Sequence, residues 1–418
     1  MHDRFGTGSG RSGGPAVAGP EPVPTTPRPP VTIRSLGPTV YLPTVIYSVG
    51  QGAVAPVIVL SGTALGASAS AASVLVGLIG VGQIVGAVPA GALIARIGER
   101  PAMLWSTALV IPALLACVFA TSVWTLGIAV AGIGLVGAVW GVARQAYVTE
   151  VVPYELRARA LSTLGGAARI GAFVGPFVGA AAMTLVGTDG AYWVHVVAAT
   201  VAVMVLLVLP ALSVDRAPGT APTRVRTLAV VRDNLAVLRT LGLGVLLVGA
   251  MRASRQTVIP LWGAHLDLDP ATLSLVFGVS GAVDMLLFYP AGRIMDRWGR
   301  RVVAVPSMFL LGLAHGLLPL ATTVVGLAAV AMLMGLGNGL SSGLIMTLGA
   351  DVSPVTGRAQ FLGAWRLCAD LGNGGGPLLI AAVLTIGPLT AAVLTMAGVG
   401  AAAVAVLHRW TPRAAAVD

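Results

Sequence analysis

The sequence predicts an all-α membrane protein of twelve transmembrane helices, arranged as two six-helix halves. Three observations support this prediction. The 418 residues are 56% hydrophobic and 10% charged, with a mean hydropathy of +0.91, whereas a typical soluble domain is about one quarter charged. Apolar segments long enough to cross a membrane recur along the chain, and the charged residues gather between them.

The first half is predicted over residues 39–212. A bilayer core about 30 Å thick needs roughly 20 apolar residues in a helix. Six segments that meet this requirement lie near residues 39–61, 72–94, 101–120, 124–147, 160–185 and 191–212.

The second half is predicted over residues 240–408. Its apolar segments lie near residues 240–263, 271–292, 302–320, 323–348, 359–386 and 388–407. Residues 213–239 between the halves are polar and contain five arginines. They predict a cytoplasmic linker with an amphipathic helix from Arg224 to Arg239.

The two ends of the chain predict cytoplasmic tails. Residues 1–38 are rich in Gly, Pro, Ser and Thr and have no apolar core, which predicts a disordered tail without a cleavable signal peptide. Residues 409–418 form the second, short tail. The two cysteines, Cys117 and Cys368, lie inside apolar segments, and they suggest neither a disulfide framework nor a metal site.

The distribution of arginine predicts the orientation in the membrane. The net charge is +10 and the chain contains no lysine. If the N-terminus is inside, the arginines fall in the even-numbered connections and the C-terminal tail. The odd-numbered connections carry no arginine and hold instead Asp189, His265, Asp267 and Asp269. The positive-inside rule therefore predicts that both termini are cytoplasmic.

Basic excess alone can indicate nucleic-acid binding, but here the arginines lie at the ends of apolar segments, so no nucleic-acid partner is expected. The all-arginine basic set and the abundant Ala, Gly and Val suggest a GC-rich bacterial genome. The predicted location is the bacterial inner membrane.

An internal repeat supports the division into two halves. Matching residues recur at a constant offset of 201 positions. The matched pairs include Gly91 and Gly292, Gly134 and Gly335, Glu150 and Asp351, Gly171 and Gly372, and Gly175 and Gly376. Parallel repeats related by an axis along the membrane normal are typical of transporters.

Two motifs carry a resemblance to a known family. The segment GRIMDRWGRR at 292–301 fits the loop motif G-x-x-x-D-R-x-G-R-R, and GAFVGPFVGA at 171–180 fits a fifth-helix motif. On these motifs, residues 39–408 resemble the major facilitator superfamily, and in particular its drug/proton antiporters. The resemblance implies a transporter that rocks two six-helix halves about a central site.

The loop motif implies a cytoplasmic latch between the halves. Its first copy, GALIARIGER at 91–100, has Ala95 in place of the acid and Glu99 in place of a base. We therefore expect the latch to depend on the second copy. The predicted latch residues are Gly292, Asp296, Arg297, Gly299, Arg300, Arg301, Glu150, Asp351 and Arg358. The alternative is that these charges only snorkel to the membrane surface and set the topology.

The fifth-helix motif predicts a closely packed, bendable helix. Glycines four residues apart let two helix backbones approach closely, and a proline kinks a helix. The motif residues are Gly171, Gly175, Pro176 and Gly179. The motif favours export, and ordinary helix packing is the alternative. Exporters of the superfamily often carry an arginine just before a Gly-x-Gly in the fourth helix. Here Ala131 stands at that position, before GIG. The absence of this arginine argues against the standard coupling scheme of those exporters.

Ionisable residues at bilayer depth are costly and suggest function. We expect proton coupling at Asp284 and Asp370, and Asp284 ranks first because Asp370 has Arg366 one helical turn away. Burial and a neighbouring arginine act in opposite directions on the proton affinity of a carboxylate. The expected charged partners are Arg169, Arg252, Arg255 and Arg366. The alternative is an ion-pair network that only holds the helices together.

The resemblance implies a substrate cavity lined by the first, fourth, seventh and tenth helices. The polar and aromatic residues that we expect there are Tyr47, Gln51, Trp140, Arg144, Gln256 and Asn338. His195 and His315 lie on helices that are peripheral in this fold, and hydrogen-bonded packing is expected for both.

The sequence contains no phosphate-binding loop, metal cluster or nucleophile–base arrangement, so no enzyme activity, cofactor or metal is expected. The expected function is proton-coupled efflux of a small amphipathic or organic-anion compound by alternating access. The expected partners are the lipid bilayer, the small-molecule substrate and protons, and the expected state is a monomer. Two alternatives stay open: uptake of a metabolite by symport or uniport, and a membrane sensor or assembly partner that transports nothing.

Overall fold

The computed structural model describes residues 36–152, 154–209, 227–354 and 356–412. These residues form helices and short connections, and they contain no strand. The predicted N-terminal tail to residue 35, the linker residues 210–226 and the final residues 413–418 lie outside the described residues.

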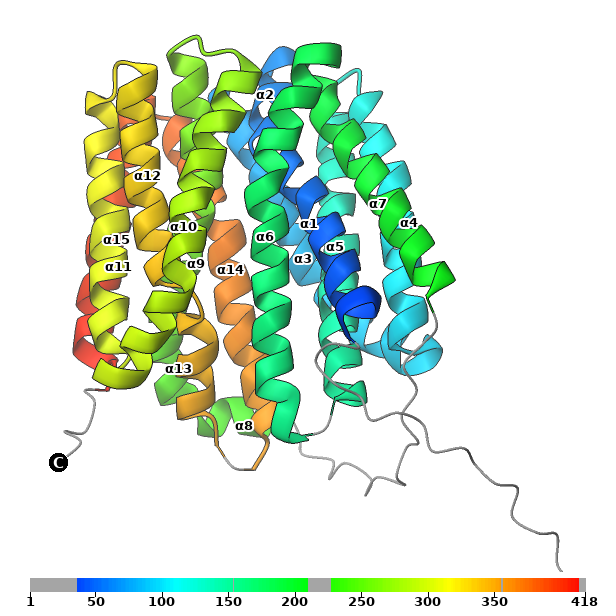
Figure 1. Cartoon of the computed structure of the whole chain (residues 1–418). Coiled ribbons are helices and arrows are strands. Elements are labelled where there is room, and N and C mark those ends of the chain that lie inside the picture. The colour runs from blue at the N-terminus through cyan, green and yellow to red at the C-terminus, as the bar shows by residue number, and fades with distance from the viewer. Residues whose placement is uncertain (1–35, 153, 210–226, 355, 413–418) are drawn as a thin grey trace, which may run out of the picture.

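The first half consists of helices α1 to α7 (Figure 1). Their bounds, with two short helical turns, are η1 (Gly37–Tyr41), α1 (Leu42–Val54), α2 (Val57–Ala64), α3 (Ala69–Ile97), α4 (Glu99–Val118), α5 (Val123–Val151), α6 (Tyr154–Val186), η2 (Gly187–Asp189) and α7 (Gly190–Val208).

The second half follows after a short helix, α8 (Thr227–Asp233). Its elements are α9 (Leu235–His265), α10 (Pro270–Trp298), α11 (Arg301–Leu317), η3 (Leu318–Leu320), α12 (Val324–Leu340), α13 (Leu344–Val352), α14 (Arg358–Leu384) and α15 (Leu389–Trp410).

The predicted membrane crossings are present. Eleven segments of the described chain are long and apolar enough to span a membrane. The longest, Arg159–Val208, contains α6 and α7, which are separate rods joined at η2 (Figure 1). Dividing this segment at η2 gives the twelve crossings that the sequence predicts.

Three helices differ from the prediction. The first crossing is divided into α1 and α2 at Ala55 and Pro56, since proline cannot continue the hydrogen-bond ladder. The tenth is divided into α12 and α13, and Gly343 between them has φ +77°, which favours glycine. The amphipathic helix predicted for Arg224–Arg239 is only the short α8 in the described residues, and Arg239 belongs to α9.

The sequence repeat is also a repeat of packing. Gly98 and Gly299 share nearly the same backbone, with φ +88° and +87°. A Cβ at Gly134 would overlap the Ile79 carbonyl oxygen, and a Cβ at Gly335 would overlap that of Ser280. The members of each pair are 201 residues apart, as are Ile79 and Ser280. The second and fourth crossings therefore pack alike in each half, α3 with α5 and α10 with α12.

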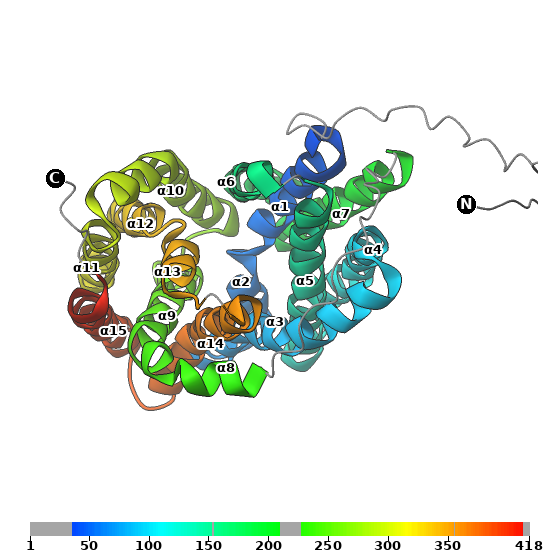
Figure 2. The same ribbon diagram turned by 90° about the horizontal axis from the view of Figure 1, so that it is seen from below.

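The two halves meet along α3 with α14 and α6 with α10 (Figures 1 and 2). Ser70 Oγ of α3 donates to the Ala381 carbonyl of α14 at 2.9 Å. Ser274 Oγ of α10 donates to the Pro176 carbonyl of α6 at 2.8 Å. Ser70 and Ser274 lie at the starts of their helices, so these bonds close the bundle at the end remote from α8 (Figure 1).

Candidate functional site

Asp284, at the middle of α10, is the centre of a polar cluster within the bundle. Its Oδ1 lies 3.4 Å from Nη1 of Arg169, and its Oδ2 lies 3.8 Å from Nη2 of Arg255. Asn338 Nδ2 donates to Oδ2 at 2.6 Å. The carboxylate therefore has contacts from three helices, α6, α9 and α12.

Arg169 of α6 is the residue that the first half contributes to this cluster. Its Nη1 also donates to Ser342 Oγ at 2.6 Å, and its guanidinium lies over the Phe288 ring, 4.5 Å from the centroid. Both partners belong to the second half. The exposed fraction of the Arg169 side chain is 23%, so its contacts with the second half leave it partly uncovered.

The other two arginines lie on α9. Arg255 Nη1 donates to Ser280 Oγ at 3.3 Å, and its guanidinium lies 5.5 Å from the Phe277 ring centroid. Arg252 Nε donates to Asn338 Oδ1 at 3.0 Å. Asn338 is buried and bridges Arg252 and Asp284.

The structure thus brings together five residues that the sequence assigns to coupling, to charged partners and to the cavity: Asp284, Arg169, Arg252, Arg255 and Asn338. Three of them carry a positive charge and one carries a negative charge. The cluster has a surplus of positive charge at bilayer depth, where an uncompensated charge is costly.

Asp370 and Arg366 form a separate pair on α14. Arg366 Nε donates to Oδ1 and Oδ2 of Asp370 at 3.0 and 3.1 Å. The Asp370 side chain is 8% exposed and that of Arg366 is 64% exposed. This pair shares no residue with the ion pairs of Asp284.

The expected cavity residues do not share one environment. Tyr47 and Trp140 are buried against each other, with ring centroids 4.8 Å apart. The prediction that they line an open cavity is wrong for this conformation, because both pack inside the first half. Gln51 is exposed, whereas Arg144 and Gln256 are partly buried.

The two histidines differ in their hydrogen bonding. His315 Nε2 lies 2.9 Å from Ser254 Oγ and Nδ1 lies 2.7 Å from the Leu311 carbonyl, which confirms hydrogen-bonded packing. For His195, the prediction of hydrogen-bonded packing is wrong. It is buried edge-on to Tyr47, and neither ring nitrogen has a partner within the part of the chain that the structure describes.

The second loop-motif copy makes its contacts inside the second half. Arg300 Nε lies 2.9 Å from Asp351 Oδ2, and Nη1 donates to the Met295 carbonyl at 2.9 Å. Asp296 is 78% exposed and lies 3.6 Å from Arg300 Nη1. Arg297 lies over the Trp298 ring. In this conformation Arg300 therefore ties the start of α11 to α13, and a latch between the halves stays a prediction.

The remaining predicted latch residues lie at helix ends of the same face. Gly292 and Gly299 lie near and at the end of α10, and Arg301 begins α11. Glu150 lies at the end of α5, and Arg358 begins α14 and is exposed.

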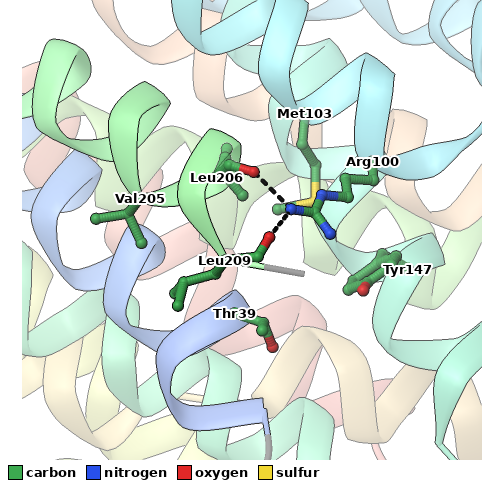
Figure 3. Close-up of a pocket in the computed structure, with 7 residues that line it drawn as sticks. All are labelled: Thr39, Arg100, Met103, Tyr147, Val205, Leu206 and Leu209. Carbon is green, nitrogen blue, oxygen red and sulfur yellow. Dashed lines mark hydrogen bonds between the residues drawn. The ribbon is translucent and has the colours of Figure 1, made fainter. Parts of the chain in front are cut away.

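The incomplete first copy has a different role. Arg100 donates through Nη2 to the carbonyls of Leu206, at 2.6 Å, and Leu209 (Figure 3). These carbonyls end α7, and a cation there completes the last turn. The guanidinium lies in a small pocket whose lining includes Thr39, Met103 and Tyr147 (Figure 3).

The fifth-helix motif packs α6 on α1. A Cβ at Gly171 would overlap the Val45 carbonyl oxygen, and one at Gly175 would overlap that of Val49. Gly179 faces Ala53. Arg169 and the Pro176 carbonyl are directed instead to the second half. The motif glycines therefore hold α6 within its own half, and another face of α6 forms the contact between halves.

Sequence reasoning missed four contacts of the cluster: Phe277, Ser280, Phe288 and Ser342. Each lies at the depth of a charged residue that the sequence identifies. A search for hydroxyl and aromatic side chains at that depth on α10 and after α12 would have found them. Among the residues that the structure describes, no group of His, Cys, Asp and Glu could hold a metal ion.

The chain belongs to the major facilitator superfamily, whose family model matches residues 40–251 and 241–418. It is therefore an integral, multi-pass membrane transporter and not an enzyme. No curated protein sequence matches the chain.

Solved structures share the fold at low identity. A POT family transporter in complex with 5-aminolevulinic acid matches with TM-score 0.73 and 12% identity, over 91% of this chain and 96% of its own. The human organic anion transporter MFSD10 (TETRAN) matches with TM-score 0.65 and 18% identity, over 90% and 100%. The nucleoside transporter NupG matches with TM-score 0.69 and 12% identity, over 91% and 99%.

Proposed function

We propose that this protein transports small organic anions by alternating access, and that a proton bound at Asp284 takes part in the same cycle. The observation that carries the proposal is the excess of arginine at Asp284, where Arg169, Arg252 and Arg255 surround one carboxylate. Such a site attracts an anion and repels an amphipathic cation. Of the two expected substrate classes, the cluster favours the organic anion.

The position of the cluster suits a central site. Arg169 comes from the first half, whereas Asp284, Arg252 and Arg255 come from the second. A substrate bound there would contact both halves. With cytoplasmic termini, as the arginine distribution predicts, the end closed by Ser70 and Ser274 is the outer one.

The arrangement favours movement of the proton and the anion in the same direction. A bound anion close to Asp284 favours the protonated carboxyl, and a proton on Asp284 removes a charge that repels the anion. Each therefore improves the binding of the other. Co-transport requires this mutual preference, so we propose proton–anion symport.

Proton-coupled export is the second proposal, and the GAFVGPFVGA pattern on α6 favours it. In antiport, the proton and the substrate must replace one another. For an anionic substrate, this requires a proton site away from the arginines that bind it. The Asp370–Arg366 pair on α14 shares no residue with the ion pairs of Asp284, and under this second proposal it would supply that proton site.

Uptake by proteoliposomes tests the substrate class. Labelled succinate, citrate and gluconate are offered to liposomes that contain the purified protein, with the neutral succinamide as the matched control. We expect uptake of at least one anion and none of succinamide. Uptake of neutral or cationic compounds alone contradicts the proposal, and binding without flux would favour a sensor.

A further inference from the structure

The terminal nitrogens of Arg252 distinguish it from the other arginines of the cluster. Arg169 Nη1 contacts Ser342 and Asp284, and Arg255 uses Nη1 for Ser280 and Nη2 for Asp284. Arg252 is held through Nε, by Asn338. Within the described part of the chain, its Nη1 and Nη2 have no hydrogen-bond or ion-pair partner.

Arg252 is also positioned to receive a ligand. Its side chain lies on α9 at bilayer depth and is only partly buried. Asn338 accepts the Nε hydrogen and also donates to Asp284 Oδ2 at 2.6 Å, which restricts the plane of the guanidinium. The edge formed by Nη1 and Nη2 is left to face a ligand.

The edge formed by Nη1 and Nη2 of Arg252 matches the geometry of a carboxylate. Two parallel N–H groups of a guanidinium pair with two oxygens of a carboxylate. A phosphate group would leave a third oxygen that needs another donor, and the nearby Nη1 atoms of Arg169 and Arg255 already contact Ser342 and Ser280.

We propose that Arg252 binds the carboxylate of the substrate through Nη1 and Nη2, while Arg169 and Arg255 hold Asp284. This inference rests on the proposed transport of organic anions and specifies it as transport of small carboxylates. It also separates two roles within the cluster: Arg252 binds the substrate, and Asn338 positions Arg252 and links it to the proton-binding acid.

Equilibrium binding of labelled succinate to the purified full-length protein tests the inference. Arg252→Lys keeps the charge but loses the two-pronged geometry, so we expect succinate binding to weaken about tenfold or more. Asn338→Ala should weaken it less, because the guanidinium remains. Arg232→Gln is the matched control, since it removes a positive charge from a side chain that is 81% exposed on α8, and it should bind as the wild type does.

A measurement on the unmodified protein covers the case in which the variants fail to fold. Phenylglyoxal reacts with free guanidinium groups, and mass spectrometry locates the modified arginines. We expect Arg252 to react faster than Arg169 and Arg255, and succinate, but not succinamide, to slow its reaction.

The outcomes separate this inference from the proposed function. If wild-type protein binds succinate and Arg252→Lys binds it equally well, or if succinate leaves Arg252 labelling unchanged, Arg252 is not the carboxylate site, although anion transport stands. If no anion among succinate, citrate and gluconate binds to or is transported by the wild type, both proposals fail.

Discussion

Arg169 of α6 and Asp284 of α10 form an ion pair between the two halves, with Nη1 3.4 Å from Oδ1. The same Nη1 donates to Ser342 at 2.6 Å. When the halves separate at this level, Arg169 must leave both partners. The acid that balances the arginines is therefore also part of a contact between the two halves.

Removing the carboxylate should destabilise the protein. Asp284→Asn leaves three arginines with no negative partner in the cluster, and we expect a loss of about 3 kcal/mol in the free energy of unfolding. Adding Arg255→Gln should restore part of this loss. Thermal unfolding in detergent measures both effects. Asp296→Asn is the control, because Asp296 is 78% exposed. An unchanged stability of Asp284→Asn would contradict the ion-pair account.

The repeat predicts matched effects at equivalent glycines. A Cβ at Gly175 would overlap the Val49 carbonyl oxygen, and a Cβ at Gly376 would overlap that of Ala250. We expect Gly175→Ala and Gly376→Ala each to cost about 1–3 kcal/mol. Gly166→Ala, on α6 where a Cβ meets no atom, should cost nothing. Equal melting temperatures for Gly175→Ala and Gly166→Ala would show that the packing is misassigned.

The closed end of the bundle depends on Gly80. A Cβ there would lie 2.5 Å from the Gly374 Cα of the other half, so Gly80→Val should separate the halves at this end. A cysteine replacing Ser274, which is fully buried, reports the separation in a background without Cys117 and Cys368. We expect faster labelling by a membrane-impermeant maleimide in Gly80→Val than in the control Gly375→Val, where a Cβ meets open space. Equal rates would argue against closure through α3 and α14.

The second loop-motif copy predicts unequal roles for two acids. Asp351 lies 2.9 Å from Arg300, whereas Asp296 lies 3.6 Å away and is more exposed. We expect Asp351→Asn to lower the transport rate more than Asp296→Asn, while both change stability by less than about 1 kcal/mol. Initial uptake rates and melting temperatures of the two variants provide the comparison. A larger effect of Asp296→Asn would favour the latch between halves that the sequence predicts.

Much of the fold is predictable because bilayer thickness and backbone hydrogen bonding limit the solutions. The apolar segments, the arginine distribution and the offset between Gly98 and Gly299 all point to the same two halves. The breaks at Pro56 and Gly343 are less predictable, since proline and glycine also occur inside continuous membrane helices, as Pro89 does in α3.

The site is predictable only in part. An ionisable side chain at bilayer depth is costly in free energy, and this cost identifies Asp284 and its arginines as candidates from the sequence. It does not identify which arginine pairs with which acid, because that depends on how the helices are rotated and packed. Tyr47 and Trp140 illustrate the limit, since an aromatic residue on a cavity helix can face the interior of its own half.

Simultaneous recording of anion uptake and internal pH tests the central claim most directly. Proteoliposomes carrying an internal pH-sensitive dye are given labelled succinate, citrate or gluconate. The account predicts uptake with internal acidification in the wild type, and uptake without a pH change in Asp284→Asn. Internal alkalinisation during uptake would contradict symport and favour antiport through another acid, and the absence of anion uptake would contradict the account as a whole.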